Sequence, residues 1–265
     1  MKKLLVFIGT LFICVVAFAQ TINVNWKIDD TTYATNTCEY GGTMTVPTAP
    51  TKYGYTFQGW KVGYIELAYI ESTGTQWIDT GYVPTNTTRL DIKYKVTQLP
   101  SNLSEGAMPI GARVGWQDRM FEVISPVNQL TTNTILVADG APIYITNSFN
   151  PLDKGIIATI DIPNKYSAFD VEGRVYSSSA SIPNVTYVYP LYMFQKNNAG
   201  IVTTSDAHIR IYYVQIKENN VLVRNFIPAK RLSDNAIGMY DTVTGRFFAN
   251  AGTGEFIAGP EVGVL

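Results

Sequence analysis

Short runs of β-branched and aromatic residues recur along most of this chain, and turn-forming residues separate them. From Tyr64 onward about fourteen such runs occupy about 195 residues, which is typical of two packed antiparallel sheets. We expect strands at 64–70, 77–82, 89–96, 107–114, 120–124, 134–137, 143–146, 156–162, 169–176, 190–195, 208–217, 221–228, 237–241 and 246–249. No segment longer than about ten residues has the apolar spacing of a helix. The sequence therefore predicts an all-β protein dominated by an antiparallel β-sandwich.

The residues between these runs favour hairpins. Asp139-Gly140, Glu172-Gly173 and Glu218-Asn219-Asn220 each separate two strand-like runs, and Thr242 to Gly245 is another expected turn. Gly, Asn and Asp tolerate the backbone conformations that tight turns need. Antiparallel pairing of consecutive strands is therefore the expected pattern.

The first nineteen residues have the pattern of a secretory signal peptide. Lys2 and Lys3 precede the apolar run 4–16, and Ala17-Phe18-Ala19 supplies the small residues that signal peptidase recognises before Gln20. The apolar run is shorter than the ~20 residues that span a bilayer, so an uncleaved anchor is the weaker alternative. We expect residues 1–19 to be removed. The remaining chain would be secreted, periplasmic or held at the cell surface, without a membrane span.

Cleavage would leave a chain with little charge and a single cysteine. Once Lys2 and Lys3 are removed, 18 basic side chains stand against 21 acidic ones, a formal charge of −3. Such a chain offers no basic surface to a phosphate backbone, so nucleic acid is not an expected partner. Cys38 would remain alone and form no internal disulfide.

A short first segment, 20–63, follows the leader. It contains GGTMTVPTAPTKYGYTFQGWKV, in which a Pro-x-x-Pro spacing precedes Gly-Tyr-x-Phe-x-Gly-Trp. This run resembles the internalin-type B-repeat, a small β-grasp-like module of bacterial surface proteins. The resemblance implies a spacer or an adhesive module. The family usually occurs in tandem arrays, whereas this chain has one copy.

The second segment, 64–260, resembles another family at its two ends. It opens with YIESTGTQWIDTGYVPTNTTRLDIKYKV and closes with HIRIYYVQIKENNVLVRNFIPAKRLSDNAIGMYDTVTGRFFANAGTGEF, which holds a Gly-x-Tyr-Asp-x-x-x-Gly-x-Phe element. Both runs are similar to the concanavalin A-like, laminin-G-like jelly-roll domains of exported bacterial proteins. The middle of the segment, 100–183, is similar to them only in the spacing of its expected strands. The resemblance implies a jelly roll that binds a glycan or another surface ligand. Residues 261–265 form an expected tail.

The residues of catalytic sites are largely missing. His208 is the one histidine, and it begins a strand in which Ile209 and Ile211 alternate with Arg210, so we expect a structural or solvent-facing role. The Glu-x-Asp-x-x-Glu pattern of jelly-roll β-glucanases is absent. Glycoside hydrolysis needs two carboxyl groups facing one substrate. We therefore predict no enzymatic activity and no catalytic residues.

No cofactor is expected, because the chain has no Cys or His cluster that would hold zinc. Calcium remains an alternative. Laminin-G-like sandwiches often hold one ion with loop oxygens, and four aspartates lie in or near loops. These are Asp118, Asp139, Asp153 and Asp206.

The best sequence candidate for a ligand site is the connection between the runs 107–114 and 120–124. It contains Trp116, Gln117, Asp118 and Arg119. Sugar sites combine an aromatic platform with a few polar groups, and this segment has both. The alternative is that Trp116 packs as a loop plug while its neighbours are solvated.

Four other aromatic residues are alternative candidates for ligand contacts. Trp77 adjoins Ile78 in a strand, and core packing is its expected role. Tyr187, Tyr189 and Tyr192 surround Pro190, where they either line a sheet face or join the core.

These inferences favour a secreted, noncatalytic binding protein that recognises a glycan or another cell-surface ligand through residues 64–260. The alternative is a structural or adhesive surface or assembly protein whose strand edges accept a strand from a protein partner.

Overall fold

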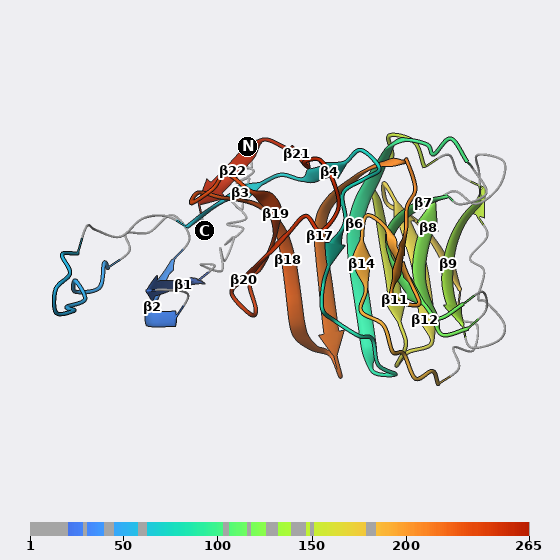
Figure 1. Cartoon of the computed structure of the whole chain (residues 1–265). Coiled ribbons are helices and arrows are strands. Elements are labelled where there is room, and N and C mark those ends of the chain that lie inside the picture. The colour runs from blue at the N-terminus through green and yellow to red at the C-terminus, as the bar shows by residue number, and fades with distance from the viewer. Residues whose placement is uncertain are drawn as a thin grey trace, which may run out of the picture. The chain divides into compact units, whose positions relative to one another are not determined.

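A computed structural model describes residues 21–28, 31–39, 45–57, 63–102, 106–115, 118–125, 132–138, 147–148, 151–178 and 184–264. All regular elements in these ranges are β-strands, which confirms the predicted fold class (Figure 1). Within the same ranges no helix has the length and apolarity needed to cross a membrane. The chain divides into two compact units, Met1–Lys61 and Val62–Leu265.

The described part of the first unit begins with a hairpin. Strand β1 (Thr21–Ile28) pairs antiparallel with β2 (Thr31–Glu39). A bulge between Trp26 and Lys27 shifts the register, so that one extra residue lies on one strand. Residues 45–57 follow without strand pairing, and Tyr53 and Tyr55 are exposed there.

The second unit contains a sheet of eight described strands in the order β10-β9-β8-β7-β14-β5, with β15 beside β7 and β16 beside β15. The strands are β5 (Ile78–Asp79), β7 (Ala107–Arg113), β8 (Met120–Ser125), β9 (Thr132–Ala138), β10 (Asn147–Ser148), β14 (Tyr192–Met193), β15 (Lys196–Asn198) and β16 (Ile201–Thr203). All pairs are antiparallel except β15 with β7.

A second sheet of twelve described strands has the order β13-β12-β11-β6-β17-β18-β19-β20. Two short pairs extend it, β4 with β21 beside β17, and β3 with β22 beside β18. The strands are β3 (Tyr64–Leu67), β4 (Ile70–Ser72), β6 (Thr88–Gln98), β11 (Ile156–Asp161), β12 (Tyr166–Val171), β13 (Arg174–Ser178), β17 (His208–Glu218), β18 (Val221–Arg231), β19 (Ile237–Asp241), β20 (Arg246–Ala249), β21 (Ile257–Ala258) and β22 (Glu261–Val264).

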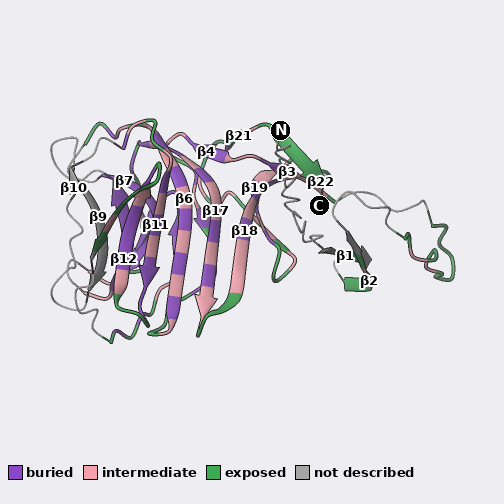
Figure 2. Cartoon of the chain, turned by 180° about the vertical axis from the view of Figure 1, so that it is seen from behind, coloured by how far each residue is buried: buried purple, intermediate pink, exposed green. Residues whose placement is uncertain are grey.

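The core lies between the two sheets, because every second side chain of a strand points to the same face. Along β6 the buried residues alternate with half-buried ones, and Figure 2 shows the same banding on β17. From the other sheet, alternate residues of β7 and β8 reach the same core. The members from these four strands include Leu90, Ile92, Tyr94, Val96, Ile110, Ala112, Phe121, Val123, Ile209, Ile211, Val214 and Ile216.

One β-bulge keeps the apolar side chains of β17 directed toward the core along the whole strand. Ile211 pairs with Tyr94 and Tyr213 pairs with Lys93, so Tyr212 is an extra residue without a partner on β6. The inward positions of β17 are Ile209 and Ile211 before this bulge, and they are Val214 and Ile216 after it. Without the extra residue, the second half of the strand would turn its apolar side chains away from the core.

Several predicted strands differ from the observed ones. The run 64–70 is divided into β3 and β4, because the chain leaves β18 after Leu67 and joins β17 at Ile70. Residues 261–265 were expected as a tail, but the structure places β22 there, paired with β3. The predicted strand 143–146 lies outside the described residues. The runs 237–241 and 246–249 coincide with β19 and β20.

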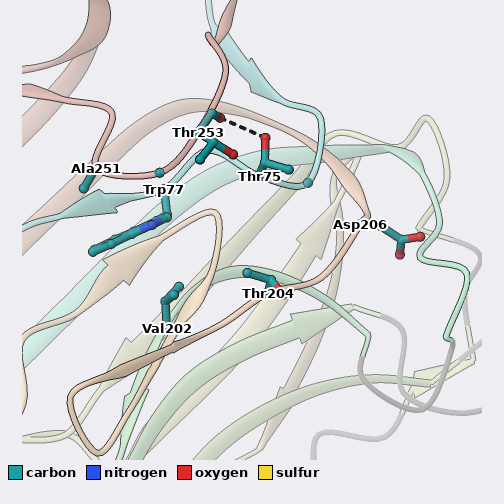
Figure 3. A pocket seen from close by; sticks show the side chains of 9 residues that line it. Thr75, Trp77, Val202, Thr204, Asp206, Ala251 and Thr253 are labelled. Carbon is teal, nitrogen blue, oxygen red and sulfur yellow. Dashed lines mark hydrogen bonds between the residues drawn. The ribbon is translucent and has the colours of Figure 1, made fainter.

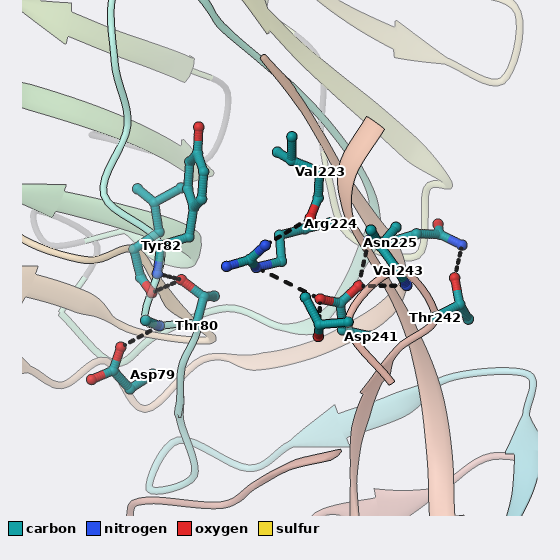
Figure 4. A network of polar contacts seen from close by, with 12 residues as sticks. Asp79, Thr80, Tyr82, Val223, Arg224, Asn225, Asp241, Thr242 and Val243 are labelled. Carbon is teal, nitrogen blue, oxygen red and sulfur yellow. Dashed lines mark hydrogen bonds and ion pairs between the residues drawn. The ribbon is translucent and has the colours of Figure 1, made fainter. Parts of the chain in front are cut away.

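The hairpin of β19 and β20 explains the Gly-x-Tyr-Asp-x-x-x-Gly-x-Phe element structurally. The Asp241 carboxylate is fully buried, accepts the backbone N–H groups of Asn225 and Val243 at 2.9 and 3.1 Å, and accepts the Thr244 hydroxyl at 2.6 Å. An ion pair with Arg224 at 3.6 Å completes its surroundings (Figure 4). A buried carboxylate needs such partners, so this aspartate holds the expected turn 242–245 in place.

The first glycine of the same element is required by close packing. A Cβ atom on Gly238 would lie 2.3 Å from the carbonyl oxygen of Phe248 and 2.8 Å from Cζ of Phe247. Backbone oxygen atoms move little, so a side chain at this position forces β19 and β20 apart.

We expect Gly238→Ala to lower the free energy of unfolding by about 3 kcal/mol, because the added methyl group overpacks the hairpin. Urea denaturation followed by intrinsic fluorescence measures the change. The matched control is Gly155→Ala, since a Cβ atom there meets nothing within 4 Å. Equal stability of the two variants would contradict this account of the hairpin.

Candidate functional site

A cleft of about 580 Å3 opens beside Trp77 in the second unit. Three segments that are distant in the sequence form its walls. The lining residues are Gly74, Thr75, Trp77, Val202, Thr204, Asp206, Ala251, Gly252 and Thr253. Figure 3 shows the Trp77 indole along one side, above Val202, with the threonine side chains nearby and Asp206 at the opposite end.

Hydrogen bonds join the first and last of these segments. The Ala251 N–H donates to the Trp77 carbonyl at 2.8 Å, and the Thr75 hydroxyl donates to the Thr253 carbonyl at 2.9 Å. Gly252 is needed where the segments meet, because a Cβ atom there would lie 2.1 Å from the Thr75 carbonyl oxygen. The wall that carries Trp77 is therefore held in one geometry.

A buried glutamine joins the first segment, 74–77, to the second, 202–206. The Gln195 amide nitrogen donates to the carbonyls of Gly74 at 2.9 Å and Ser205 at 3.0 Å, and its oxygen accepts the Ser205 N–H at 2.7 Å. Gly74 has a φ of +103°, and a Cβ atom there would lie 2.7 Å from Cα of Asp206. These contacts fix the distance between the segments 74–77 and 202–206.

Trp77 lies outside the core, contrary to its expected role. Ile78 takes the inward position in β5, so the residue before it points outward. The Trp77 ring packs against Tyr192, with centroids 4.4 Å apart and planes tilted by 32°. Of the three tyrosines around Pro190, Tyr192 joins this outer face, whereas Tyr187 and Tyr189 pack in or against the core.

Asp206 gives the cleft a negative charge. Its carboxylate accepts the Ser101 N–H at 2.8 Å. Hydrogen bonding from Ser101 lowers the pKa of the Asp206 carboxyl below its usual value. The carboxylate therefore stays ionised at neutral pH and can accept hydrogen bonds from hydroxyl groups of a ligand.

A second polar group lies on the same outer face of the eight-stranded sheet. Glu122, Gly111, Tyr192 and Asp79 are direct partners across β8, β7, β14 and β5. Side chains of directly paired residues point to the same side of a sheet. Glu122 lies against Gly111, where a Cβ atom would be 3.0 Å from Cγ of Glu122.

Glu122 is a buried carboxyl on this face. It is 1% exposed, and neither carboxyl oxygen has a hydrogen-bond partner among the described residues. The Arg113 Nε lies 3.7 Å from Oε1, and it donates to Asn198 Oδ1 at 3.0 Å. Burial raises the pKa of Glu122 to about 7, although the charges of Lys196 and Arg113 oppose this rise.

The predicted ligand segment is described only in part. Trp116 and Gln117 lie outside the described residues. Asp118 and Arg119 belong to the turn between β7 and β8, where Asp118 forms an isolated bridge with Gly115. The two charged side chains lie together, with Arg119 Nε 3.5 Å from Asp118 Oδ1.

Among the described residues, no three His, Cys, Asp or Glu side chains lie together as a metal site would require. Of the four aspartates considered for calcium, Asp139 is outside the described ranges. Asp153 lies 3.9 Å from the Lys95 ammonium, Asp118 pairs with Arg119, and Asp206 binds Ser101.

Sequence reasoning overlooked Glu122 as a site residue, although a signal was present. It is the one charged residue in the strand Met-Phe-Glu-Val-Ile-Ser, and a charged side chain within an otherwise apolar strand is a candidate for a functional role because such residues are rarely buried without a partner. In comparisons with known proteins, no family model, curated protein or solved structure matches this chain. Its function must therefore be inferred from this geometry.

The buried carboxyl predicts a pH-dependent stability. Between pH 4.5 and about 7 the folded state retains a proton on Glu122 that the unfolded state releases. Stability is therefore lost as pH rises through this window, by about 3 kcal/mol in total. Glu122→Gln removes this loss, so its stability advantage over the unmodified protein should grow by about 3 kcal/mol from pH 4 to pH 8.

Urea denaturation of both proteins at the two pH values measures the difference. Glu172→Gln is the control, because this glutamate lies in an exposed turn and pairs with Lys154 at the surface. A stability advantage of Glu122→Gln that is the same at pH 4 and pH 8 would show that the carboxyl is not buried as described.

Proposed function

We propose that the second unit is a noncatalytic glycan-binding module of a protein that acts outside the cytoplasm. The observation that carries this proposal is the cleft beside Trp77. An indole ring can stack on the C–H face of a sugar, while hydroxyl groups and a carboxylate bind the sugar's hydroxyls. The cleft combines the ring with the side chains of Thr75, Thr204, Thr253 and Asp206.

The rigid walls of the cleft support binding. The bonds from Gln195 and between Ala251 and Trp77 hold the site without a ligand. A preformed site loses little conformational entropy when a ligand binds, so more of the contact energy appears as affinity.

Binding without turnover is supported by the surroundings of Glu122. Its neighbours on the same face of β8 are Met120 and Ile124, so this strand carries no second carboxyl beside it. Glycosidases place two carboxyl groups about 5–10 Å apart across the sugar. Strand β8 therefore does not by itself supply the carboxyl pair of a glycosidase.

The two resemblances and the leader fit this proposal. The signal-peptide pattern of residues 1–19 would export the protein. The laminin-G-like pattern of the second unit is that of surface-binding modules, and the B-repeat-like pattern of residues 20–63 suits a spacer. Under this proposal, the first unit presents the second to its ligand.

We expect Trp77→Ala to weaken glycan binding at least about tenfold, because about 1.4 kcal/mol of stacking is lost. Trp77→Phe should retain part of the affinity. A glycan array with the purified chain first identifies a binding sugar, and isothermal titration calorimetry then gives the dissociation constants.

The control variant is Tyr53→Ala, which removes an aromatic side chain that is fully exposed in the first unit. Its affinity should equal that of the unmodified protein. An array without any binding, from protein whose circular dichroism shows folded β-structure, would overturn the proposal. Equal losses from Trp77→Ala and Tyr53→Ala would place the site elsewhere.

One observation favours a second role, binding of a protein partner by strand addition. Strand β13 ends the twelve-stranded sheet and pairs with β12 alone among the described strands. Val175, the second residue of this strand, is 57% exposed. Exposed edges of this kind accept further strands.

If this edge mediates self-assembly, light scattering should detect association that rises with protein concentration. Val175→Lys should abolish it, because a charge on an edge strand opposes pairing. A monomer at every concentration would contradict assembly of the chain with itself through β13.

A further inference from the structure

The charge that lines the cleft beside Trp77 is negative. Of the described side chains in its walls, the Asp206 carboxylate is the one that carries a charge, and it is exposed. It accepts the Ser101 N–H at 2.8 Å. No basic side chain of the described residues lies close enough to form an ion pair with it. The carboxylate at the far end of the cleft is therefore accessible to a positively charged ligand (Figure 3).

A second carboxylate lies beside the aromatic pair of the cleft. Asp79 follows Trp77 by two residues, so both side chains point to the same side of the extended chain. Asp79 is also the direct partner of Tyr192, the ring that contacts Trp77. Burial and, after it, the negative charge of Asp79 raise the pKa of the Tyr192 hydroxyl.

Asp79 is as accessible as the first carboxylate. The residue is exposed, and its carboxylate accepts the Gly81 N–H at 2.8 Å. It forms no ion pair with another described residue. Trp77 thus has one carboxylate on the side of Tyr192 and another at the far end of the cleft.

The described cations of the same sheet act on a different carboxyl group. Arg113 and Lys196 act on Glu122, which is three strands away from Asp79 in the row β8-β7-β14-β5. Three strand spacings of about 4.8 Å make a separation of about 14 Å. This exceeds the screening length of about 8 Å at physiological salt, so these cations do not neutralise Asp79.

One further group acts on the other carboxylate. Hydrogen bonding from Ser101 and, to a smaller extent, the charge of His208 lower the pKa of the Asp206 carboxyl. Asp206 therefore stays ionised. A protonated His208 would compete with a cationic ligand for it.

Two carboxylates beside an indole ring favour a ligand with ammonium groups. The face of an indole attracts cations, and a carboxylate accepts charge-assisted hydrogen bonds from them. A cleft lined by one sign of charge also concentrates ligands of the opposite sign. Neutral sugars gain nothing from this field, and acidic sugars are repelled by it. Sugars with a free amino group have both the C–H face for the indole and the positive charge.

We propose that the cleft beside Trp77 selects glycans that contain free amino sugars, such as glucosamine, whose ammonium groups pair with Asp206 and Asp79. The proposal rests on the glycan-binding function and adds the ligand class. One sugar ring stacks on the indole, and the ammonium groups on it and on its neighbour reach the two carboxylates.

The experiment compares a β-1,4-linked tetramer of glucosamine with its fully N-acetylated counterpart, which has the same sugar skeleton without the charge. Isothermal titration calorimetry measures their binding to the full chain at pH 6, where the amino groups are largely protonated. We expect the charged tetramer to bind about fivefold more tightly, the size of one partly exposed ion pair.

Two comparisons separate charge from shape. The preference should shrink when sodium chloride is raised from about 20 mM to about 500 mM, because salt screens charges and leaves the bulk of the acetyl groups unchanged. A tetralysine peptide should bind more weakly than the glucosamine tetramer, because it has no sugar face to stack on Trp77.

Variants locate the effect. Asp206→Asn and Asp79→Asn each keep an oxygen that accepts the local backbone N–H, so each should lower the preference without unfolding the protein, and together they should remove it. Asp170→Asn is the matched control, because it makes the same change of net charge at a carboxylate that accepts the Gly173 N–H at 2.8 Å in the other sheet. It should leave the preference unchanged. His208→Gln should not weaken it, since this variant removes a competing cation.

The outcomes separate this inference from the function on which it rests. Equal binding of the two tetramers, lost in Trp77→Ala, overturns the selection of amino sugars and leaves glycan binding intact. A preference that survives the double variant or high salt, or that Asp170→Asn or His208→Gln removes, also overturns it. Tetralysine binding as tight as that of the glucosamine tetramer would show that the cleft recognises charge without a sugar, and this too overturns it. If neither tetramer nor any sugar on an array binds, the proposed function fails as well.

Discussion

The register between β6 and β17 is the constraint on which the rest of the second unit depends. Buried residues lie directly opposite one another in this pair, Val96 with Ile209, Tyr94 with Ile211, Ile92 with Val214 and Leu90 with Ile216. Buried residues stay opposite one another along the whole pair only because Tyr212 is an extra residue of β17 with no partner on β6. A shift by one residue would expose half of the core of this sheet, and the facing sheet would lose the surface on which it packs.

The candidate site follows from the same two-residue alternation in the opposite sheet. Phe121 and Val123 enter the core, so Glu122 between them must point outward. Ile78 enters the core, so its neighbour Trp77 must point outward as well. Packing thus assigns these two residues to one face, although 44 positions separate them in the sequence. This arrangement buries the Glu122 carboxyl group, and burial is unfavourable for its ionised form. Sites that bind ligands often contain such unfavourably placed groups.

Local patterns explain what could be predicted from the sequence, and long-range contacts explain what could not. The hairpins β12–β13 and β19–β20 were predictable because Gly173 and Gly245 mark their turns and the strands are adjacent in the chain. The division of residues 64–70 depends on a change of partner strand, which no local pattern reveals. The cleft was missed for the same reason, because hydrogen bonds unite residues 75–77 with residues 250–254. The expectation that Trp77 packs in the core rests on its adjacency to Ile78, but neighbouring residues of a strand point to opposite faces.

The pairing of β3 with β22 determines how the second unit responds to mechanical force. Ile65 lies opposite Val264 and Leu67 lies opposite Glu261, so the first and last described strands of the unit have their outer ends side by side. Tension applied between these ends would break the connecting bonds one after another, as in peeling, and not all together, as in shear. The β22 strand would detach at low force, while Thr75 and Trp77 would remain bonded to the segment 250–254. A load on this unit would thus first lengthen the chain and leave the walls of the cleft in place.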